Sequence, residues 1–283
     1  MSLFRIHANT PALTALNSVY GSSNKIAVHQ ARLASGKRIN TAKDDSAGYA
    51  IARSLQQRSQ GLRAALSNVR NAKSILTIAE GGYQAQMDVL LTIKGKTVQA
   101  ADSSLSSEQR TAVRNQVKEL LAEVDDIQNQ AKWNGNNIFG STFSFHVGAD
   151  KDDKLAVTMN TSTSAQVGGD TSANLSSMGE TGGEFSIEDE TKSALAIGAV
   201  DTAIQSLATV IQGIGDTIIR LGLKADALSI TASNTETTRS QYEDADMAVE
   251  QIEFLKHQIV QQTGISALSQ ANTAPQIVLS LFR

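Results

Sequence analysis

Apolar residues recur at alternating steps of three and four along the segment that begins at residue 197. The positions that follow this rhythm carry no charge, and they are Ile197, Val200, Ile204, Leu207, Ile211, Ile214, Ile218, Leu221, Ala225, Leu228 and Ala232. This spacing places them on one face of an α-helix and is typical of coiled coils. Gly198, Gly213, Gly215 and Gly222 lie in the same segment, and each costs about 1 kcal/mol relative to Ala. The pattern predicts a long helix that needs a packing partner.

Two further segments show the same periodicity. The first contains a single polar interruption, Gln86, in the series Leu62, Ala65, Val69, Ala72, Leu76, Ala79, Tyr83, Gln86, Leu90 and Ile93. The second follows a Ser-Ser-Glu sequence at 106–108 that is typical of a helix start, and its series is Val113, Val117, Leu120, Val124, Ile127 and Ala131. We expect both segments to be long helices that pack along these stripes.

The two ends of the chain carry weaker versions of the pattern. At the N-terminal end Leu16, Val19, Ile26 and Leu33 share their predicted seam with Ser23 and Gln30. At the C-terminal end the predicted seam is Ala245, Ala248, Ile252, Leu255 and Ile259, followed by Gln262. Polar residues in such a seam weaken a coiled coil but can fix its register. We therefore expect a helical arm at each end.

A different pattern separates the helical segments. Residues 142–147 and 154–160 alternate apolar and polar positions around a turn-like GADKDDK sequence, which predicts a β-hairpin, placed at the far tip of the helices. Residues 160–184 are small, polar and Gly-rich, which is typical of a surface loop. The fold class predicted is mainly α, an elongated antiparallel helical bundle or coiled coil with a small β-hairpin.

Composition narrows the function classes. The chain has 283 residues, a net charge of −3 and no cysteine, so disulfides and thiolate chemistry are excluded, and no nucleic-acid footprint is indicated. Residues 1–43 contain basic residues but no Asp or Glu. No run of apolar residues is long enough to predict membrane insertion, and the first residues lack the apolar region of a secretory signal. We expect a cytosolic chain or one exported without such a signal.

Candidate catalytic and ligand-binding motifs are weak. Gly95-Lys96-Thr97 lacks the preceding glycine of a phosphate loop, and the acids at 150–153 lack the glycine and glutamate of a calcium loop. The four histidines, His7, His29, His146 and His257, lie far apart with no two at ligand spacing. The sequence therefore predicts no enzyme activity, no cofactor and no metal site.

The closing residues pose the sharpest question. Large apolar side chains occupy most of the last seven positions, namely Ile277, Val278, Leu279, Leu281 and Phe282. A solvated stretch of this kind is an aggregation hazard. Either the tail packs within its own domain or another molecule buries it.

Long motifs at the two ends resemble bacterial flagellin. The stretch LASGKRINTAKDDSAGYAIA at 33–52 resembles the N-terminal flagellin signature, and YEDADMA, QQTG and SQANTAPQIVLSLFR resemble the C-terminal region. The signature residues are Ser35, Gly36, Arg38, Ile39, Asn40, Asp44, Asp45 and Gly48. WNG at 133–135 and VGA at 147–149 also fall where flagellins carry similar residues. The resemblance covers residues 1–160 and 190–283.

The resemblance implies a three-part organisation. Residues 1–42 with 240–283 would form a terminal filament-core coiled coil, and 43–160 with 190–239 a rod-like helical domain with the hairpin. Residues 161–189 would be a short polar outer tip where larger flagellins carry outer domains. The implied filament-core assembly residues are Leu16, Val19, Ile26, Leu33, Ile252, Leu255, Ile259, Ile277, Val278, Leu279, Leu281 and Phe282. On this interpretation neighbouring subunits bury the apolar tail.

The implied function is that of a structural subunit that polymerises into the flagellar filament for swimming motility. The implied partners are other copies of the chain, hook-associated junction and cap proteins, the export chaperone and type III export apparatus, and other flagellins. The filament would be extracellular. The alternatives are a hook–filament junction protein, which shares such terminal helices, and more distantly a coiled-coil adaptor or chaperone whose termini are folded in the monomer.

Two further features follow from the resemblance. The stretch at 91–99 matches the segment that many flagellins present to the animal innate receptor, but Thr92, Gly95 and Lys96 replace the Arg, Glu and Leu of that segment, so we expect weak receptor activation. Asn160 and Asn174 begin N-glycosylation sequons in a region rich in Ser and Thr. Either glycosylation or a bare solvent-facing loop fits these residues.

Overall fold

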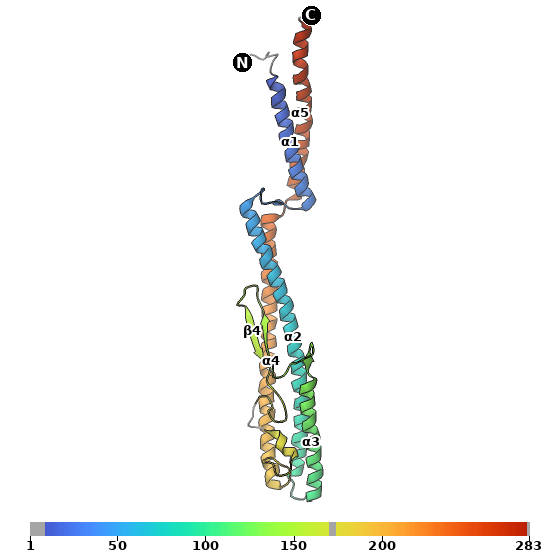
Figure 1. The fold of residues 1–283 in the computed structure, drawn as a ribbon, viewed down its shortest axis with the longest axis vertical. Coiled ribbons are helices and arrows are strands. Elements are labelled where there is room, and N and C mark those ends of the chain that lie inside the picture. Colours follow the sequence, from blue (N-terminus) through green and yellow to red (C-terminus); the bar gives the residue numbers. More distant parts are fainter. Residues whose placement is uncertain (1–8, 170–173, 282–283) are drawn as a thin grey trace. The chain divides into compact units, whose positions relative to one another are not determined.

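The computed structural model describes residues 9–169 and 174–281, with side chains described up to residue 273. The elements are α1 (Thr10–Ser35), α2 (Ser46–Ala100), α3 (Ser107–Gln130), β1 (Lys132–Trp133), β2 (Asn136–Asn137), β3 (Thr142–His146), β4 (Lys154–Thr158), the 3₁₀ helix η1 (Leu175–Gly179), α4 (Glu190–Glu243) and α5 (Met247–Leu281). The predicted fold class, mainly α with antiparallel helices and a β-hairpin, is confirmed (Figure 1).

The chain divides into two compact units. The central unit comprises residues 60–232, and the terminal unit comprises the described residues of 1–59 and 233–283. Helices α2 and α4 contribute residues to both units.

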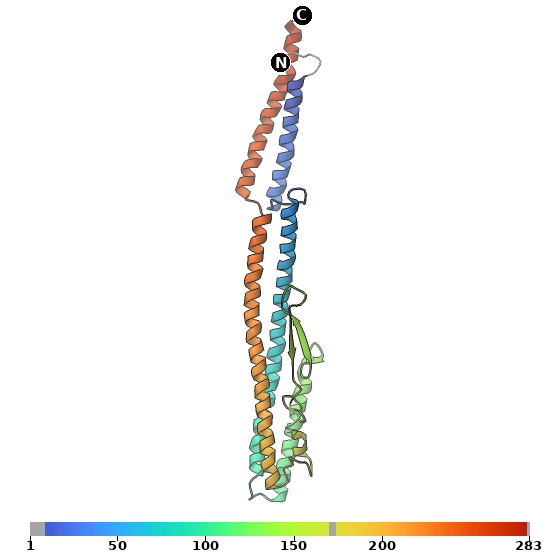
Figure 2. The ribbon, with the colours of Figure 1, turned by 90° about the vertical axis from the view of Figure 1, so that its left-hand side faces the viewer.

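One hydrophobic cluster joins α2, α3, α4 and the hairpin in the central unit. All ten positions of the periodic series from Leu62 to Ile93 are buried, which confirms that prediction. On α4, residues at strict spacings of seven are buried, namely Val200, Leu207, Ile214, Leu221 and Leu228. Figures 1 and 2 show α2 and α4 running beside each other in this unit. An ion pair at 2.6 Å between Lys94 and Asp201 adds to the packing.

Helix α3 begins where the sequence predicted. The Ser106 side chain accepts a hydrogen bond from the backbone N–H of Gln109, and the Gln109 side chain accepts one from the Ser106 N–H, which completes a capping box. The predicted seam needs one correction. Leu121 is buried, whereas the predicted Leu120 is only partly buried. The helix face that contacts the core steps by four residues after Val117, and not by three.

The predicted hairpin is confirmed, but its predicted place at the far tip is wrong. Strands β3 and β4 pair antiparallel from Thr142 with Thr158 to His146 with Lys154. The Asn68 side chain donates to the carbonyl of His146, and Gly61 lies against Ala149. The hairpin therefore packs beside α2 near Gly61 and Asn68, far from the end of that helix at Ala100. Its half-buried Phe143 and Phe145 pack against the hydrophobic cluster.

The segment predicted to be a polar surface loop also differs from that expectation. Its large apolar residues Val167, Leu175 and Met178 are buried in the core cluster. Asp125 accepts hydrogen bonds from the N–H and the hydroxyl of Ser164, at 2.6 and 2.8 Å, which ties the segment to α3. The sparse apolar residues of this Gly-rich stretch carry no helical or strand period, so the sequence pattern did not reveal their burial.

Helix α4 is long and apolar enough to cross a membrane by length and composition, with a window of mean hydropathy 1.6. The core helices of water-soluble proteins pass the same test. The heptad residues of α4 are packed in the core of the central unit.

Candidate assembly surface of the terminal unit

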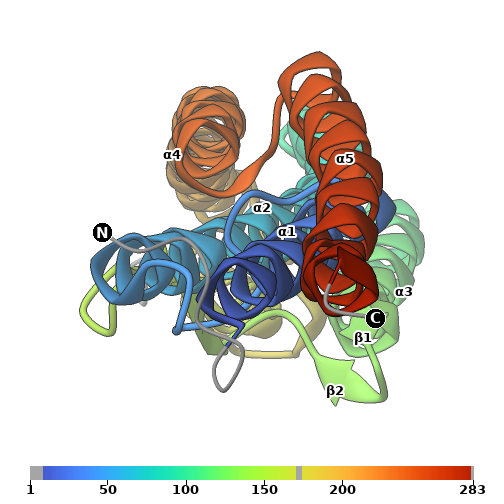
Figure 3. The ribbon, with the colours of Figure 1, turned by 90° about the horizontal axis from the view of Figure 1, so that it is seen from above.

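Helices α1 and α5 pack against each other in the terminal unit, as Figures 1 and 3 show. At one end the Asn9 side chain donates to the carbonyl of Ala271 at 2.9 Å, and it also caps the first turn of α1. Toward the other end Arg32 pairs with Glu250 at 3.1 Å. Because the start of α1 meets the end of α5, the two helices are antiparallel.

The seam on α1 follows the predicted apolar positions with shifted polar neighbours. Leu16, Val19, Ile26 and Leu33 are partly buried, as expected of seam residues. The polar residues that join them are Ser22 and His29, not Ser23 and Gln30. Val19, Ser22, Ile26, His29 and Leu33 still follow steps of three and four, so the heptad spacing is kept and only its polar positions lie one residue earlier.

The seam on α5 mixes polar and apolar side chains. Glu250 is buried there, and Phe254, His257, Gln261 and Leu268 are partly buried. Gly264 lies so close to α1 that an added Cβ would stand 2.9 Å from the Cγ2 of Val19. The side of α5 that faces α1 thus combines close approach at Gly264 with polar and apolar contacts.

The apolar residues predicted to form the seam of α5 do not pack against α1. Ile252, Leu255 and Ile259 are 64%, 46% and 63% exposed, so they do not face α1. Their spacing of three and four places them on one face of the helix. We call these three residues the α5 stripe. Further exposed apolar side chains on the two helices are Leu13, Tyr20, Val28, Met247, Val249, Val260 and Ile265.

The apolar tail belongs in part to α5. The backbone of Ile277, Val278, Leu279 and Leu281 continues this helix, but their side chains are not among those described, and Phe282 lies outside the described residues. Their assembly role stays a prediction.

The signature segment at 35–48 folds the connection between α1 and α2 onto the connection between α4 and α5. Gly36 ends α1 in the left-handed region, with φ of 70°, and its carbonyl accepts from the N–H of Ala245. The Arg38 N–H donates to the carbonyl of Glu243 at 2.7 Å, and Lys37 pairs with the Glu243 carboxylate at 2.6 Å. Ile39 is buried beneath this network.

The remaining signature residues shape the start of α2. One carboxylate oxygen of Asp44 accepts from the N–H groups of Asn40 and Thr41 and from the Thr41 hydroxyl. These bonds, those from Thr41 first, lower the pKa of Asp44. Asp45 accepts from the N–H of Gly48 at 2.9 Å, and a Cβ at Gly48 would stand 2.5 Å from that carboxylate. The motif therefore has a structural explanation in this chain, and Ser35 adds a hydroxyl that accepts from the N–H of Lys37.

The other predicted sites lie in the central unit. Thr92 and Gly95 are exposed on α2, and Lys96 is partly exposed. Asn174 is exposed, and its side chain caps η1 by accepting from the N–H of Ser176. Asn160 is partly buried, and its amide nitrogen donates to the carbonyl of Gly168 at 2.9 Å. Receptor recognition and glycosylation stay predictions.

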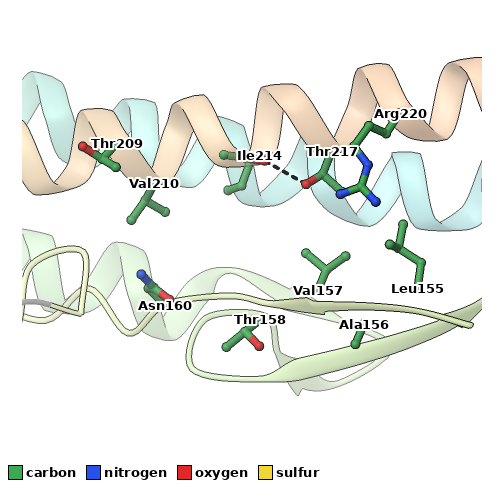
Figure 4. Close-up of a pocket in the computed structure, with 11 residues that line it drawn as sticks. Leu155, Ala156, Val157, Thr158, Asn160, Thr209, Val210, Ile214, Thr217 and Arg220 are labelled. Carbon is green, nitrogen blue, oxygen red and sulfur yellow. Dashed lines mark hydrogen bonds between the residues drawn. The ribbon is translucent and has the colours of Figure 1, made fainter.

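A groove of about 350 Å³ lies between the hairpin and α4 (Figure 4). Leu155, Val157, Val210 and Ile214 make its apolar walls, and Arg220 contributes its charged group. Acidic, histidine and cysteine side chains are missing from the residues that line it. The groove therefore offers no pair of groups for acid–base or nucleophilic catalysis.

Two family models match the chain. The bacterial flagellin N-terminal helical region matches residues 6–144, and the bacterial flagellin C-terminal helical region matches residues 197–282. The chain belongs to the flagellin family. This confirms the resemblance found in the terminal motifs, and flagellins are a family of structural proteins.

Curated flagellins align with this member over nearly its full length. The flagellar filament 33 kDa core protein of Treponema phagedenis is 31% identical, with 98% of this chain and 99% of that protein aligned. The flagellin of Bacillus subtilis (strain 168) is 27% identical, with 99% and 100% aligned. A solved structure assigned to a flagellar hook-associated protein of Vibrio parahaemolyticus matches with a TM-score of 0.59 and 15% identity, covering 71% of this chain and 100% of that one. The last likeness shows a shared fold alone.

Proposed function

We propose that this flagellin polymerises into the flagellar filament through its terminal unit, with the α5 stripe as a principal contact. The single observation that carries this proposal is the exposure of the α5 stripe. Ile252, Leu255 and Ile259 are exposed, while a different face of α5, which mixes polar and apolar residues, packs against α1. A helix that leaves its apolar face uncovered within its own chain is suited to cover it with another chain.

Burial of the α5 stripe supplies a sizeable driving force. Each large aliphatic side chain contributes about 1.5–3 kcal/mol when it is fully removed from water. The three residues together therefore contribute several kcal/mol per subunit before ordering costs are deducted. If the stripe contacts a different surface of the neighbouring copy, repetition of that contact generates an open helical filament when its rotation does not close a ring.

The central unit offers a second exposed apolar face. Ile219, Leu223 and Ile230 are 64%, 67% and 62% exposed, and their spacing places them on one side of α4. We assign this face to lateral or axial contacts between subunits. The terminal unit then forms the filament core and the central unit the rod-like layer, with residues 161–189 in place of the outer domains of larger flagellins.

The finer parts of the proposal follow from family membership. The chain would leave the cell through the flagellar type III export apparatus with its chaperone, and would join hook-associated junction and cap proteins and other flagellins in an extracellular filament. The absence of cysteine and the glycine-rich α4 suit a chain exported in an unfolded state. A hook–filament junction protein is the second candidate, and the shared fold of the hook-associated structure is compatible with it.

Seeded polymerisation tests the proposal. Full-length protein with Ile252→Ser and Ile259→Ser is compared with wild type by sedimentation and negative-stain electron microscopy. We expect the double variant to lose most of its sedimenting filament, because two large side chains no longer gain burial. Long filaments, and not short caps on hooks, distinguish a filament subunit from a junction protein.

The matched control changes exposed polar residues of the same helix. Gln251→Ser with Gln258→Ser places the same new residues in neighbouring turns, and both glutamines are exposed. We expect this variant to assemble like wild type. Equal assembly of both double variants would show that the α5 stripe is not a filament contact.

A further inference from the structure

Two histidines that are remote in sequence meet in the seam between α1 and α5. The His29 ring from α1 stacks on the His257 ring from α5, with centroids 5.6 Å apart and an angle of 17° between the planes. Glu253, one turn before His257, places a carboxylate oxygen 3.7 Å from the Nε2 of His257. One potential ligand atom from each of the three residues lies within 4.8 Å of the other two.

The histidine side chains are largely removed from water. They are 14% and 12% exposed for His29 and His257. The Nδ1 of His257 is buried and has no hydrogen-bond partner among the described residues.

A buried carboxylate orients the first histidine. Glu250 contacts the Nδ1 of His29 at 2.5 Å, and its other oxygen pairs with Arg32 at 3.1 Å. This contact leaves Nε2 as the ring nitrogen of His29 for a further ligand. Metal-binding histidines commonly donate their second ring nitrogen to a carboxylate in this way, which fixes the tautomer and the ring orientation.

We propose that His29, Glu253 and His257 bind a zinc ion that braces α1 against α5. Two imidazoles and one carboxylate are a ligand set that zinc accepts, with water in the fourth position. Tetrahedral zinc with bonds of about 2.0–2.1 Å holds its ligand atoms about 3.3 Å apart. The ligand atoms of the three side chains lie within 4.8 Å of one another, so the ion would draw them closer by about 1.5 Å.

The charges around the site are compatible with a dication. Glu250 and Glu253 face the two histidines, and Lys25, Arg32 and Lys256 surround them. Lys256 now pairs with Glu253 at 3.0 Å, but its side chain is 59% exposed. It can therefore swing into water when the carboxylate turns to the metal. The site is independent of the polymerisation proposal, since all of its ligands come from one chain.

Zinc binding by the full-length, metal-free protein tests the site. The chain has four histidines, so two double variants divide them into matched pairs, His29→Ala with His257→Ala and His7→Ala with His146→Ala. Equilibrium dialysis against zinc is performed at pH 7.5 on both unassembled and sedimented protein. Cobalt absorption in the visible range reports tetrahedral coordination, and circular dichroism reports the helix content of each variant.

We expect one zinc per chain in wild type and in the His7/His146 variant, in at least one of the two fractions. The His29/His257 variant should bind at least tenfold more weakly at unchanged helix content. Glu250→Gln keeps all three ligands and should weaken binding by about tenfold through loss of ring orientation. Zinc should also raise the melting temperature of wild type but not of the His29/His257 variant.

Equal binding by the two histidine variants would overturn the proposal, as would a failure of wild type to bind stoichiometric zinc in both fractions. If the His29/His257 variant loses helix, His257→Gln takes its place in the comparison. Seeded assembly of the same samples reads the filament proposal separately. Wild-type protein that forms filaments but binds no zinc would reject only the metal site. Wild-type protein that binds zinc but forms no filaments would reject only the polymerisation proposal.

Discussion

At the scale of single residues, Gln86 shows how a polar side chain specifies a packing arrangement. It is fully buried in the otherwise apolar stripe of α2. Its amide nitrogen donates to the carbonyl oxygens of Val124 and Ser162, at 2.9 and 2.8 Å. One side chain thus joins α2 to α3 and to the segment that follows the hairpin. A buried donor with two acceptors fixes the relative position of these three segments more narrowly than an apolar contact does.

Replacement of this residue has a predictable cost. Gln86→Leu removes two hydrogen bonds to buried carbonyl groups, and we expect it to lower the free energy of unfolding by about 2 kcal/mol. Urea denaturation followed by circular dichroism measures the change. Gln84→Leu, at an exposed position two residues earlier, should stay within about 0.5 kcal/mol of wild type. Equal stability of the two variants would contradict the structural role of Gln86.

At the scale of the element, α4 carries two apolar faces with different fates. Its heptad face is buried in the central unit, whereas Ile219, Leu223 and Ile230 are exposed. The sequence pattern marks the first face strongly, because its spacing continues over many turns. The second face is shorter and is interrupted by polar residues, so it stands out only once burial is known.

The two faces should respond differently to truncation. Leu221 is 0% exposed and Leu223 is 67% exposed, although only one residue separates them. We expect Leu221→Ala to destabilise the protein by about 3 kcal/mol, since it leaves a cavity in the core. Leu223→Ala should change stability by less than about 0.5 kcal/mol. The unfolding midpoints of the two variants, measured side by side, decide the matter, and a reversed order would disprove the assignment of the faces.

At the scale of the whole molecule, the chain has two units that use different kinds of contact. The central unit has the continuous hydrophobic cluster. The terminal unit has the mixed polar and apolar seam between α1 and α5, together with exposed apolar faces. A unit with few buried apolar residues is expected at the low end of local stability. The terminal unit is thus the part of the chain that gains most from burial against another subunit.

A deletion of the C-terminal tail separates its role in assembly from the stability of the central unit. A chain that ends after Ala274 lacks the apolar tail but keeps every residue of the central unit. We expect it to show no seeded assembly, while the main thermal unfolding transition stays within a few degrees of that of wild type. Sedimentation and differential scanning calorimetry of the two chains provide the measurements. Normal assembly of the shortened chain would remove the tail from the filament contacts.

The sequence predicted well the features that depend on neighbouring residues, and poorly those that depend on contacts between distant parts of the chain. The stripes of α2 and α4, the start of α3 and the pairing of β3 with β4 depend on residues close in sequence, and each was predicted. The position of the hairpin, the burial of Val167, Leu175 and Met178, and the choice between Leu120 and Leu121 depend on distant parts of the chain. Those details were predicted wrongly or not at all.

The amino-acid sequence by itself determined which residues share a helix face, because the α-helical repeat fixes that from spacing alone. It also determined family membership, through long motifs at both ends. Only the tertiary structure decided what each face contacts. It turned Ile252, Leu255 and Ile259 away from α1, allowed close approach at Gly264, and brought His29 to His257. Periodicity carries no information about the partner of a face, since that choice depends on the sum of contacts between segments far apart in the chain.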